Sequence, residues 1–106
     1  MVVLFDQFNL PENVVEVQQL LWSSDSSILY VKVRKDNNQH ELLVYFRANY
    51  HWYIKNVVYL DSEDLVHPLS SQSSHHQLLV VTASNIELLE FETRLPEKEW
   101  KSLAAE

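Results

Sequence analysis

Glycine is missing from this sequence: none of its 106 residues is glycine. Ordinary usage of about 7% would supply roughly seven. Turns must therefore be built from asparagine, aspartate, serine and proline, which bond the local backbone or fix its φ angle. Phosphate-cradling loops need glycine for the close approach of the backbone to the ligand. The common classes of nucleotide-binding enzyme are therefore disfavoured.

Cysteine is absent as well, and basic residues are few. Without cysteine, disulfide bonds and thiolate metal sites are excluded, and the composition fits a reducing compartment. Eight Lys and Arg residues against 15 Asp and Glu residues give a net charge of −7. Such a chain is a poor electrostatic match for nucleic acid, which attracts a basic surface.

Long apolar runs are also lacking. No stretch approaches the roughly 20 apolar residues of a membrane-spanning helix. The first six residues, Met-Val-Val-Leu-Phe-Asp, lack the basic residues of a signal peptide. We therefore expect no membrane association and a cytoplasmic location, with the nucleus as the alternative.

Short apolar runs separated by polar clusters fill the sequence, and this rhythm is typical of β-strands and turns. In residues 28–34, Leu29, Val31 and Val33 alternate with polar residues and share one face of a strand. Residues 42–46 are continuously apolar, as in a strand buried on both faces. Further strands are predicted over 14–22, 52–60, 78–82 and 86–91, the last two as a hairpin.

The order of runs and polar clusters suggests a division of the chain. Residues 1–13 are interpreted as the end of a preceding blade, 14–60 as a nearly complete blade, 61–77 as a polar connection, 78–96 as part of the next blade and 97–106 as a frayed tail. Four strands in about 45 residues match the repeat of a β-propeller. On rhythm alone, a six- or seven-stranded sandwich or small barrel fits equally well.

Two stretches carry a more specific signal. The first, over 17–29, places an apolar strand, a Ser/Asp-rich turn and a second apolar strand in the manner of Trp-Asp repeat propellers. The second is Asn49-Tyr50-His51-Trp52-Tyr53-Ile54-Lys55. Together with Leu20-Leu21-Trp22-Ser23-Ser24-Asp25-Ser26-Ser27, it resembles the N-terminal propeller region of the Elongator complex protein 1 family, the largest Elongator subunits. The sequence departs from that family at Tyr45, where the strand usually ends in Leu-Trp, and at Ala48, where glycine is usual.

This resemblance implies an all-β fold of antiparallel sheets, about two incomplete blades of a WD40-like β-propeller. It implies a non-catalytic scaffold role in Elongator, which modifies the wobble uridine of certain tRNAs, through contacts with other Elongator subunits. Transfer RNA would be met only through the complex, and no enzyme activity, cofactor, metal or small-molecule ligand is expected. The family-signature residues, interpreted as packing residues, are Trp22, Asp25, Asn49, Tyr50, His51, Trp52 and Tyr53. The alternatives are a generic WD40-like adaptor in another complex and a small β-sandwich nucleic-acid-binding domain.

Histidines near position 75 invite a metal site, formed by His75 and His76 with His67 nearby. Adjacent residues of an extended strand point to opposite faces, however, and a zinc site needs further ligands in a fixed frame. The Ser- and Gln-rich surroundings favour a solvated loop.

Three further patterns also have simpler interpretations. Ser26, His51 and Asp61 contain the residue types of a hydrolase catalytic triad, but the glycines that form a nucleophile elbow are missing, which argues against hydrolase activity. The aromatic run over 50–53 fits core and inter-blade packing better than a protein-interaction hot spot or a base-stacking surface. The acidic stretch over 87–92 fits a solvated face that discourages edge pairing.

Overall fold

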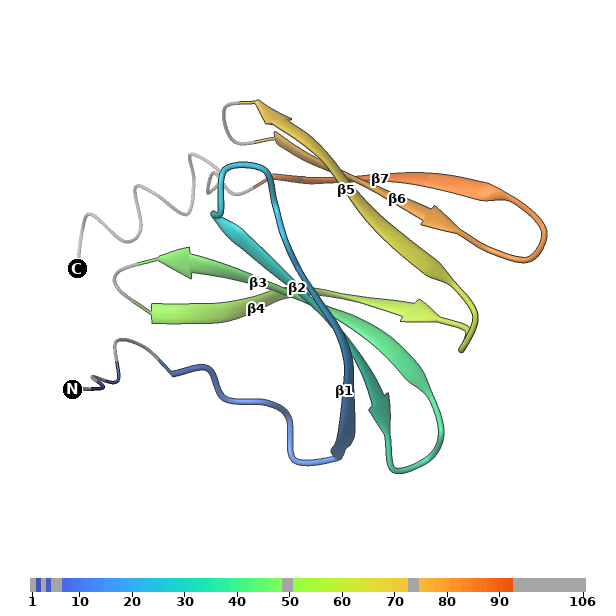
Figure 1. Cartoon of the computed structure of the whole chain (residues 1–106), viewed down its shortest axis with the longest axis horizontal. Helices are drawn as coiled ribbons and strands as arrows, with labels where there is room; N and C mark the ends of the chain where they lie inside the picture. Colours follow the sequence, from blue (N-terminus) through green and yellow to red (C-terminus); the bar gives the residue numbers. More distant parts are fainter. Residues whose placement is uncertain (1, 3, 5–6, 49–50, 73–74, 93–106) are drawn as a thin grey trace, which may run out of the picture.

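Two antiparallel β-sheets make up the computed structural model, which describes residues 2, 4, 7–48, 51–72 and 75–92 (Figure 1). The four-stranded sheet has the order β1-β2-β3-β4 and the three-stranded sheet the order β5-β6-β7. The strands are β1 (Val14–Trp22), β2 (Ile28–Lys35), β3 (His40–Ala48), β4 (His51–Leu60), β5 (Leu65–Gln72), β6 (His75–Val81) and β7 (Ile86–Glu92). The predicted all-β, antiparallel fold class is confirmed, and so is the hairpin formed by β6 and β7.

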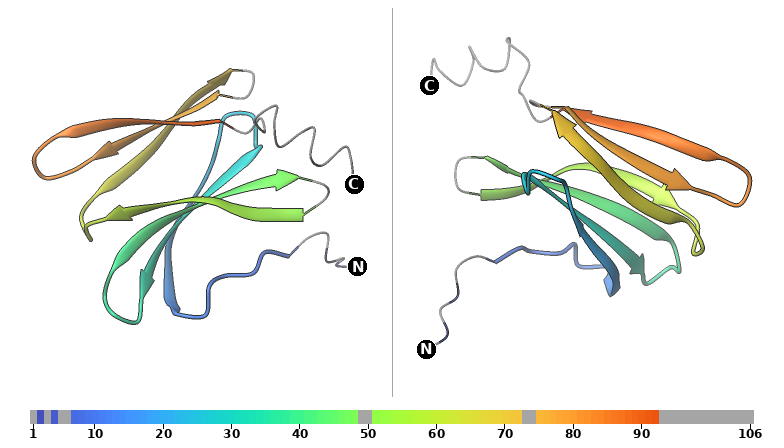
Figure 2. Two further views of the ribbon diagram at one scale, coloured as in Figure 1. Left: turned by 180° about the vertical axis from the view of Figure 1, so that it is seen from behind. Right: turned by 45° about the horizontal axis from the view of Figure 1, so that its top comes forward.

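The two sheets lie face to face as two layers (Figure 2). Between them, Ile28, Tyr30, Leu42 and Val44 of the four-stranded sheet pack against residues of the three-stranded sheet. The contributions of that second sheet are Val66, Leu78, Val80 and Phe91. This inter-sheet core joins the layers because it removes apolar side chains of both from water.

A second apolar cluster lies on the other side of the four-stranded sheet, which we call its outer face. Leu29, Val31, Val33, Leu43 and Tyr45 are buried there, and Phe8 of the segment 7–13 packs against them. Strands β2 and β3 are thus buried on both faces. This double burial explains why the sequence over 42–46 is continuously apolar.

The turns are made without glycine, as the composition requires. Ser26 and Asn38 have positive φ angles, 62° and 64°, in the left-handed region that glycine usually occupies. Asn38 lies in the β2–β3 turn, where its backbone N–H donates to the Lys35 carbonyl oxygen at 2.9 Å. Asparagine tolerates this conformation, whereas for serine the left-handed region costs about 1–2 kcal/mol.

The polar connection predicted over 61–77 is corrected by the structure. Strand β5 lies within it and pairs with β6, and β6 already begins at His75. The prediction overlooked β5 because that strand contains Pro68 and several serines. Strand β5 is at the edge of its sheet, where a proline without an N–H is tolerated, and the pairing shifts register just after Pro68.

No strand is present among the described residues between 2 and 13, so the preceding-blade strand is not seen there. The tail predicted over 97–106 lies outside the described residues.

A buried lysine secures the loop that joins the two sheets. Lys32 projects from β2 on the inter-sheet side and is only 8% exposed. Its Nζ donates to the carbonyl oxygens of Ser62 at 3.3 Å and Asp64 at 2.7 Å. The Asp64 carboxylate in turn accepts from the Asp61 backbone N–H at 2.9 Å. The lysine therefore fixes the direction in which the chain leaves the first sheet.

Candidate functional site

Two of the family-signature residues meet on the outer face of the four-stranded sheet. Trp22 ends β1 and Trp52 lies near the start of β4, so antiparallel pairing brings both to the same end of the sheet. Their ring centroids are 5.7 Å apart in an edge-on arrangement. Phe8 lies 4.5 Å from Trp52 and 5.8 Å from Tyr45. We call Phe8, Trp22, Tyr45 and Trp52 the aromatic cluster.

A buried hydroxyl attaches the segment 7–13 to this cluster. The Tyr45 hydroxyl donates to the Asn9 carbonyl oxygen at 2.9 Å. Burial raises the pKa of Tyr45, so the hydroxyl keeps its proton and acts as a donor at neutral pH. The segment therefore contacts the outer face through both an aromatic ring and a hydrogen bond.

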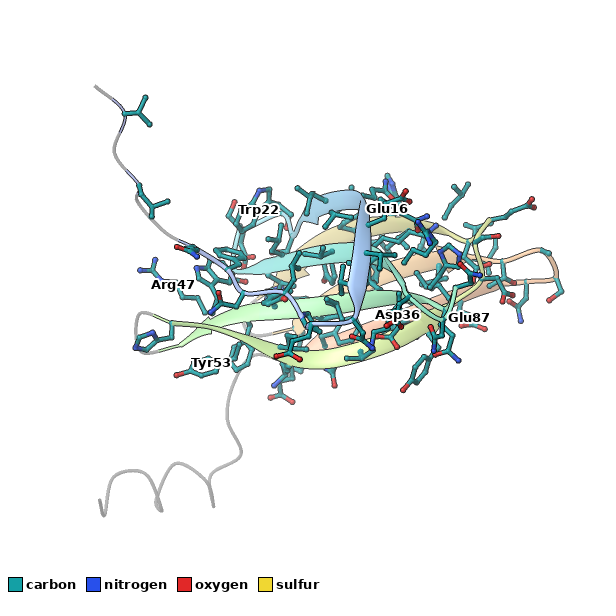
Figure 3. The ribbon with its side chains drawn as sticks, turned by 90° about the horizontal axis from the view of Figure 1, so that it is seen from below. Glu16, Trp22, Asp36, Arg47, Tyr53 and Glu87 are labelled. Carbon is teal, nitrogen blue, oxygen red and sulfur yellow. The ribbon has the colours of Figure 1, made fainter. Side chains whose placement is uncertain are left out.

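One side of the aromatic cluster remains open. Trp22 is 50% exposed. A cavity of about 370 Å³ lies beside the cluster, lined by Gln7, Asn9, Tyr45, His51, Trp52, Tyr53 and Ile54. Trp22, Arg47 and Tyr53 gather at one end of the molecule, while Asp36 and Glu87 lie at the opposite end (Figure 3). An open aromatic surface with polar atoms at its rim suits contact with another protein.

The rest of the Asn49–Lys55 motif is divided between the two sides of β4. Tyr53 pairs with Phe46, which packs against the inter-sheet core, and their rings are 6.2 Å apart. His51 is exposed, with its ring 6.3 Å from that of Tyr53. Asn49 and Tyr50 lie outside the described residues. The described part of the motif, residues 51–55, is therefore not one continuous aromatic surface on which bases could stack.

The remaining signature residue, Asp25, organises the turn between β1 and β2. Its Oδ1 accepts from the Ser23 hydroxyl at 2.8 Å, from the Ser27 hydroxyl at 2.7 Å and from the Ser27 backbone N–H at 3.1 Å. Burial alone would raise the pKa of Asp25, but these hydrogen bonds outweigh it and the pKa is lowered. The carboxylate is therefore ionised at neutral pH.

The same turn meets a histidine of the other sheet. His76 lies on the inner side of β6 and is 1% exposed. Its Nδ1 is 3.8 Å from Asp25 Oδ1, and its Nε2 is 3.4 Å from the Ser27 hydroxyl. We call Asp25, Ser27 and His76 the inter-sheet clasp, because these contacts join the two sheets; Ser27 and His76 are 49 positions apart in the sequence.

The charge state of His76 follows from its surroundings. Burial lowers its pKa, the Asp25 carboxylate opposes this effect, and the neighbouring His75 reinforces it. The net shift is downward, so the imidazole is neutral near pH 7.

The inter-sheet clasp contains the residue types of a hydrolase triad but not its geometry. The Ser27 hydroxyl donates directly to Asp25 at 2.7 Å, so its proton is directed to the carboxylate rather than to the imidazole. The serine–histidine distance of 3.4 Å exceeds the usual reach of about 2.6–3.2 Å between a nucleophile and its base. This arrangement is suited to holding the sheets together.

A tyrosine beside the clasp has an unusual hydroxyl. Tyr30 is buried in the inter-sheet core, its ring 6.1 Å from that of Phe91. Its hydroxyl has no hydrogen-bond partner among the described residues. Burial, assisted by the charge of Asp25, raises the pKa of Tyr30 to about 12. The hydroxyl is therefore an uncompensated polar group inside the core.

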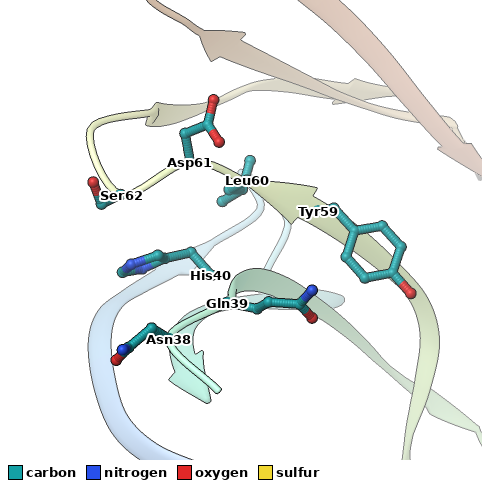
Figure 4. Close-up of a pocket in the computed structure, with 7 residues that line it drawn as sticks. All are labelled: Asn38, Gln39, His40, Tyr59, Leu60, Asp61 and Ser62. Atoms are coloured by element: carbon teal, nitrogen blue, oxygen red, sulfur yellow. The ribbon is translucent and has the colours of Figure 1, made fainter. Parts of the chain in front are cut away.

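A polar pocket of about 630 Å³ lies at the far end of the four-stranded sheet (Figure 4). Its lining comes from the β2–β3 turn and the end of β4, and consists of Asn38, Gln39, His40, Tyr59, Leu60, Asp61 and Ser62. The His40 imidazole lies 3.0 Å from the Gln18 side-chain oxygen. The pocket holds one imidazole and one carboxylate, and no group of three or more potential metal ligands occurs among the residues that the structure describes.

The other candidates from the sequence are also placed. The solvated loop predicted at His75–His76 is wrong: both residues belong to β6. As expected of neighbours in a strand, they point apart: His76 is buried and His75 is exposed, paired with Glu90 at 2.8 Å. His51 and Asp61 lie at opposite ends of β4, so no triad with Ser26 forms.

Sequence reasoning missed the role of His76. The sequence pattern that could have indicated the burial of His76 is the alternation of positions 76, 78 and 80. In a strand, this alternation places His76 on the same inward face as Leu78 and Val80.

Comparison with known proteins decides the family. Residues 5–85 match the family described as "ELP1 first N-terminal beta-propeller". The chain belongs to this family. It is 35% identical over 85 residues to Elongator complex protein 1 of Drosophila melanogaster, an alignment that covers 77% of this chain and 6% of that protein. No solved structure matches the chain significantly.

Membership of the ELP1 propeller family confirms the resemblance carried by the Leu20–Ser27 and Asn49–Lys55 stretches, both of which lie inside the matched range. The two stacked antiparallel sheets are consistent with incomplete propeller blades. In the part of the chain that is described, no helix has the length and apolar character to cross a membrane.

Proposed function

We propose that this chain is a non-catalytic structural segment of the Elongator scaffold and supports tRNA wobble-uridine modification through protein–protein contacts. The observation that carries the proposal is the match of residues 5–85 to the ELP1 propeller family. Because the chain spans only 6% of the length of its Drosophila relative, the activity and partners of a whole Elongator subunit come to it as part of this proposal.

The geometry of the polar groups supports a structural role. The Asp25 carboxylate is engaged by two serines of its own turn, and His76 is enclosed between the sheets. The open aromatic cluster around Trp22 and Trp52 offers a surface for another Elongator subunit. Large aromatic side chains at such positions often dominate the binding energy of protein interfaces.

A genetic experiment tests the proposal. Disrupting the gene should lower the fraction of modified wobble uridines in tRNA, measured by mass spectrometry of digested nucleosides, and re-expression of the chain should restore it. Trp22→Ala should restore the modification poorly. Tyr59→Ala, an exposed aromatic at the opposite end of the sheet, should restore it fully. Unchanged modification after disruption would remove the Elongator role.

Contact with tRNA is proposed to be indirect, because the net charge of −7 opposes binding to phosphates. Titration of labelled tRNA with the purified chain at low salt should show no saturable binding. Saturable binding that weakens steeply with salt would instead favour a nucleic-acid-binding domain.

We also propose that the chain resides in the cytoplasm. Fluorescence imaging of a tagged chain together with another Elongator subunit should show coincident cytoplasmic signals. An exclusively nuclear signal would overturn this part of the proposal.

A further inference from the structure

A cavity of about 350 Å³ lies between the two sheets, at the end that carries the β4–β5 loop and the β6–β7 turn (Figure 1). We call it the inter-sheet cavity. Its floor is apolar: Leu60 of β4 and Val80 of β6 are buried, and the partly buried Val58 packs beside them. Further blades of a propeller would pack on the outer faces of the two sheets, so they would not fill this space between them.

A buried carboxylate lines the inter-sheet cavity. Asp64 is only 6% exposed. Its Oδ2 accepts from the Asp61 backbone N–H at 2.9 Å, whereas its Oδ1 has no hydrogen-bond partner among the described residues. The nearby Lys32 ammonium donates to the Asp64 carbonyl oxygen rather than to the carboxylate. Because a buried charge is costly unless it is paired, the Asp64 carboxylate is suited to receive a cationic donor.

The rim of the inter-sheet cavity is acidic, and its two loops are held by hydrogen bonds. Asp61 and Glu87 lie on opposite walls, and both are exposed. On one side, Lys32 fixes the β4–β5 loop. On the other, the Thr82 hydroxyl donates to the Asn85 side-chain oxygen at 2.7 Å and accepts from the Asn85 backbone N–H at 3.0 Å. A cavity with such fixed walls binds without the entropic cost of ordering its loops.

We propose that the inter-sheet cavity binds a lysine or arginine side chain of a partner protein. The aliphatic stem of that side chain lies against Leu60 and Val80, and its charged head pairs with the Asp64 carboxylate. The carboxylates would repel an anion, and an uncharged side chain would leave Asp64 without a counter-ion. Sites for free small molecules bury most of their ligand, whereas the exposed Asp61 and Glu87 mark a mouth on the surface that a protein side chain can enter.

An NMR titration of the ¹⁵N-labelled chain with synthetic peptides tests this site. The probes are acetyl-Ala-Lys-Ala-amide, its arginine counterpart and its norleucine counterpart, whose side chain has the stem of lysine without the charge. The lysine and arginine peptides should shift the amide signals of Leu60 and Val80 in a saturable manner. The norleucine peptide should bind at least about tenfold more weakly, because it lacks the charge-assisted hydrogen bond to Asp64.

Two variants localise the site. Asp64→Asn keeps an acceptor for the Asp61 N–H but removes the charge, and it should weaken binding of the lysine peptide by about tenfold. Glu87→Gln changes an exposed residue of the opposite wall and should weaken binding by about two- to threefold. Asp36→Asn is the matched control: Asp36 is exposed at the same end of the molecule as Glu87 but does not line the cavity, so the affinity should be unchanged (Figure 3).

Circular dichroism of the variants shows whether they are folded. If Asp64→Asn does not fold, the comparison of Glu87→Gln with Asp36→Asn decides. The proposed site is overturned if the lysine peptide causes no saturable shift at Leu60 or Val80, if the norleucine peptide binds equally well, or if the cavity variants behave like Asp36→Asn. The peptides are synthetic and no Elongator subunit is present, so the outcome is separate from the scaffold proposal.

Discussion

Two buried tyrosine hydroxyls make opposite contributions to stability. The Tyr30 hydroxyl has no partner among the described residues, whereas the Tyr45 hydroxyl donates to Asn9. Tyr30→Phe removes an unsatisfied polar group and should leave the free energy of unfolding unchanged or raise it by up to about 1 kcal/mol. Tyr45→Phe loses a hydrogen bond and should lower it by about 1 kcal/mol. Urea denaturation followed by circular dichroism measures both variants.

Each tyrosine variant is the control for the other, because the same atom is removed from a buried ring. Destabilisation of the Tyr30 variant to the extent of the Tyr45 variant would show that the Tyr30 hydroxyl has a hydrogen-bond partner.

His76 should make the stability of the fold depend on pH. Its pKa is lowered from the usual 6.5, mainly by burial, so the folded state binds the proton less readily than the unfolded state. The stabilisation is complete above about pH 6.5 and is lost as the pH falls below it, by at most about 1.4 kcal/mol per pH unit. The Asp25 carboxylate attracts the protonated His76 ring and so reduces this pH dependence. The neighbouring His75 lowers the pKa of His76 further and so increases the pH dependence. Urea denaturation between pH 7.5 and pH 5, at intervals of about half a unit, measures this dependence.

Substitution identifies the histidine responsible. His76→Gln should flatten the pH dependence, whereas His75→Gln, at the exposed neighbouring position, should retain it. A slope that persists in His76→Gln would assign the titration to another group.

The direction of the loop between β4 and β5 depends on Lys32. Lys32→Met keeps the length of the side chain but removes the donor to the Ser62 and Asp64 carbonyl oxygens. We expect the free energy of unfolding to fall by about 2 kcal/mol, because hydrogen bonds from a charged donor contribute about 1.5–3 kcal/mol. Arg34→Met is the control. Arg34 makes a partly exposed ion pair with Glu16 at 3.8 Å, and its loss should cost less than about 1 kcal/mol. Equal effects of the two substitutions would contradict the role given to Lys32.

Most strands could be predicted from the sequence because their side chains alternate or run continuously apolar. Alternation identified β2, and the continuous run over 42–46 identified β3. Strand β5 escaped prediction because an edge strand tolerates Pro68, so its composition is that of a loop.

The site was only partly predictable. The sequence singled out Trp22 and Trp52 as family-signature residues, and the structure brings them together across the sheet. The partner of Asp25 could not be inferred, because its contact with His76 depends on how one sheet packs over the other. Local spacing does not encode that packing.

The two sheets together bury one inter-sheet core, and we expect them to unfold together. Leu78 is fully buried in this core. Leu78→Ala should lower the free energy of unfolding by about 2–5 kcal/mol. The exposed Leu20→Ala should change it by less than about 0.5 kcal/mol. Tryptophan fluorescence of a Trp100→Phe chain, in which the two remaining tryptophans, Trp22 and Trp52, belong to the four-stranded sheet, should follow the same transition as circular dichroism. Separate transitions would show that the sheets fold independently.

Quantitative co-purification of the tagged chain from the cells that express it tests the scaffold role most directly. We predict that Elongator subunits are enriched with the chain over an untagged control, and that Trp22→Ala reduces this enrichment while Tyr59→Ala does not. Circular dichroism of both variants should show that they remain folded. If the folded chain recovers no Elongator subunit above the control, the proposal that it belongs to the Elongator scaffold is contradicted.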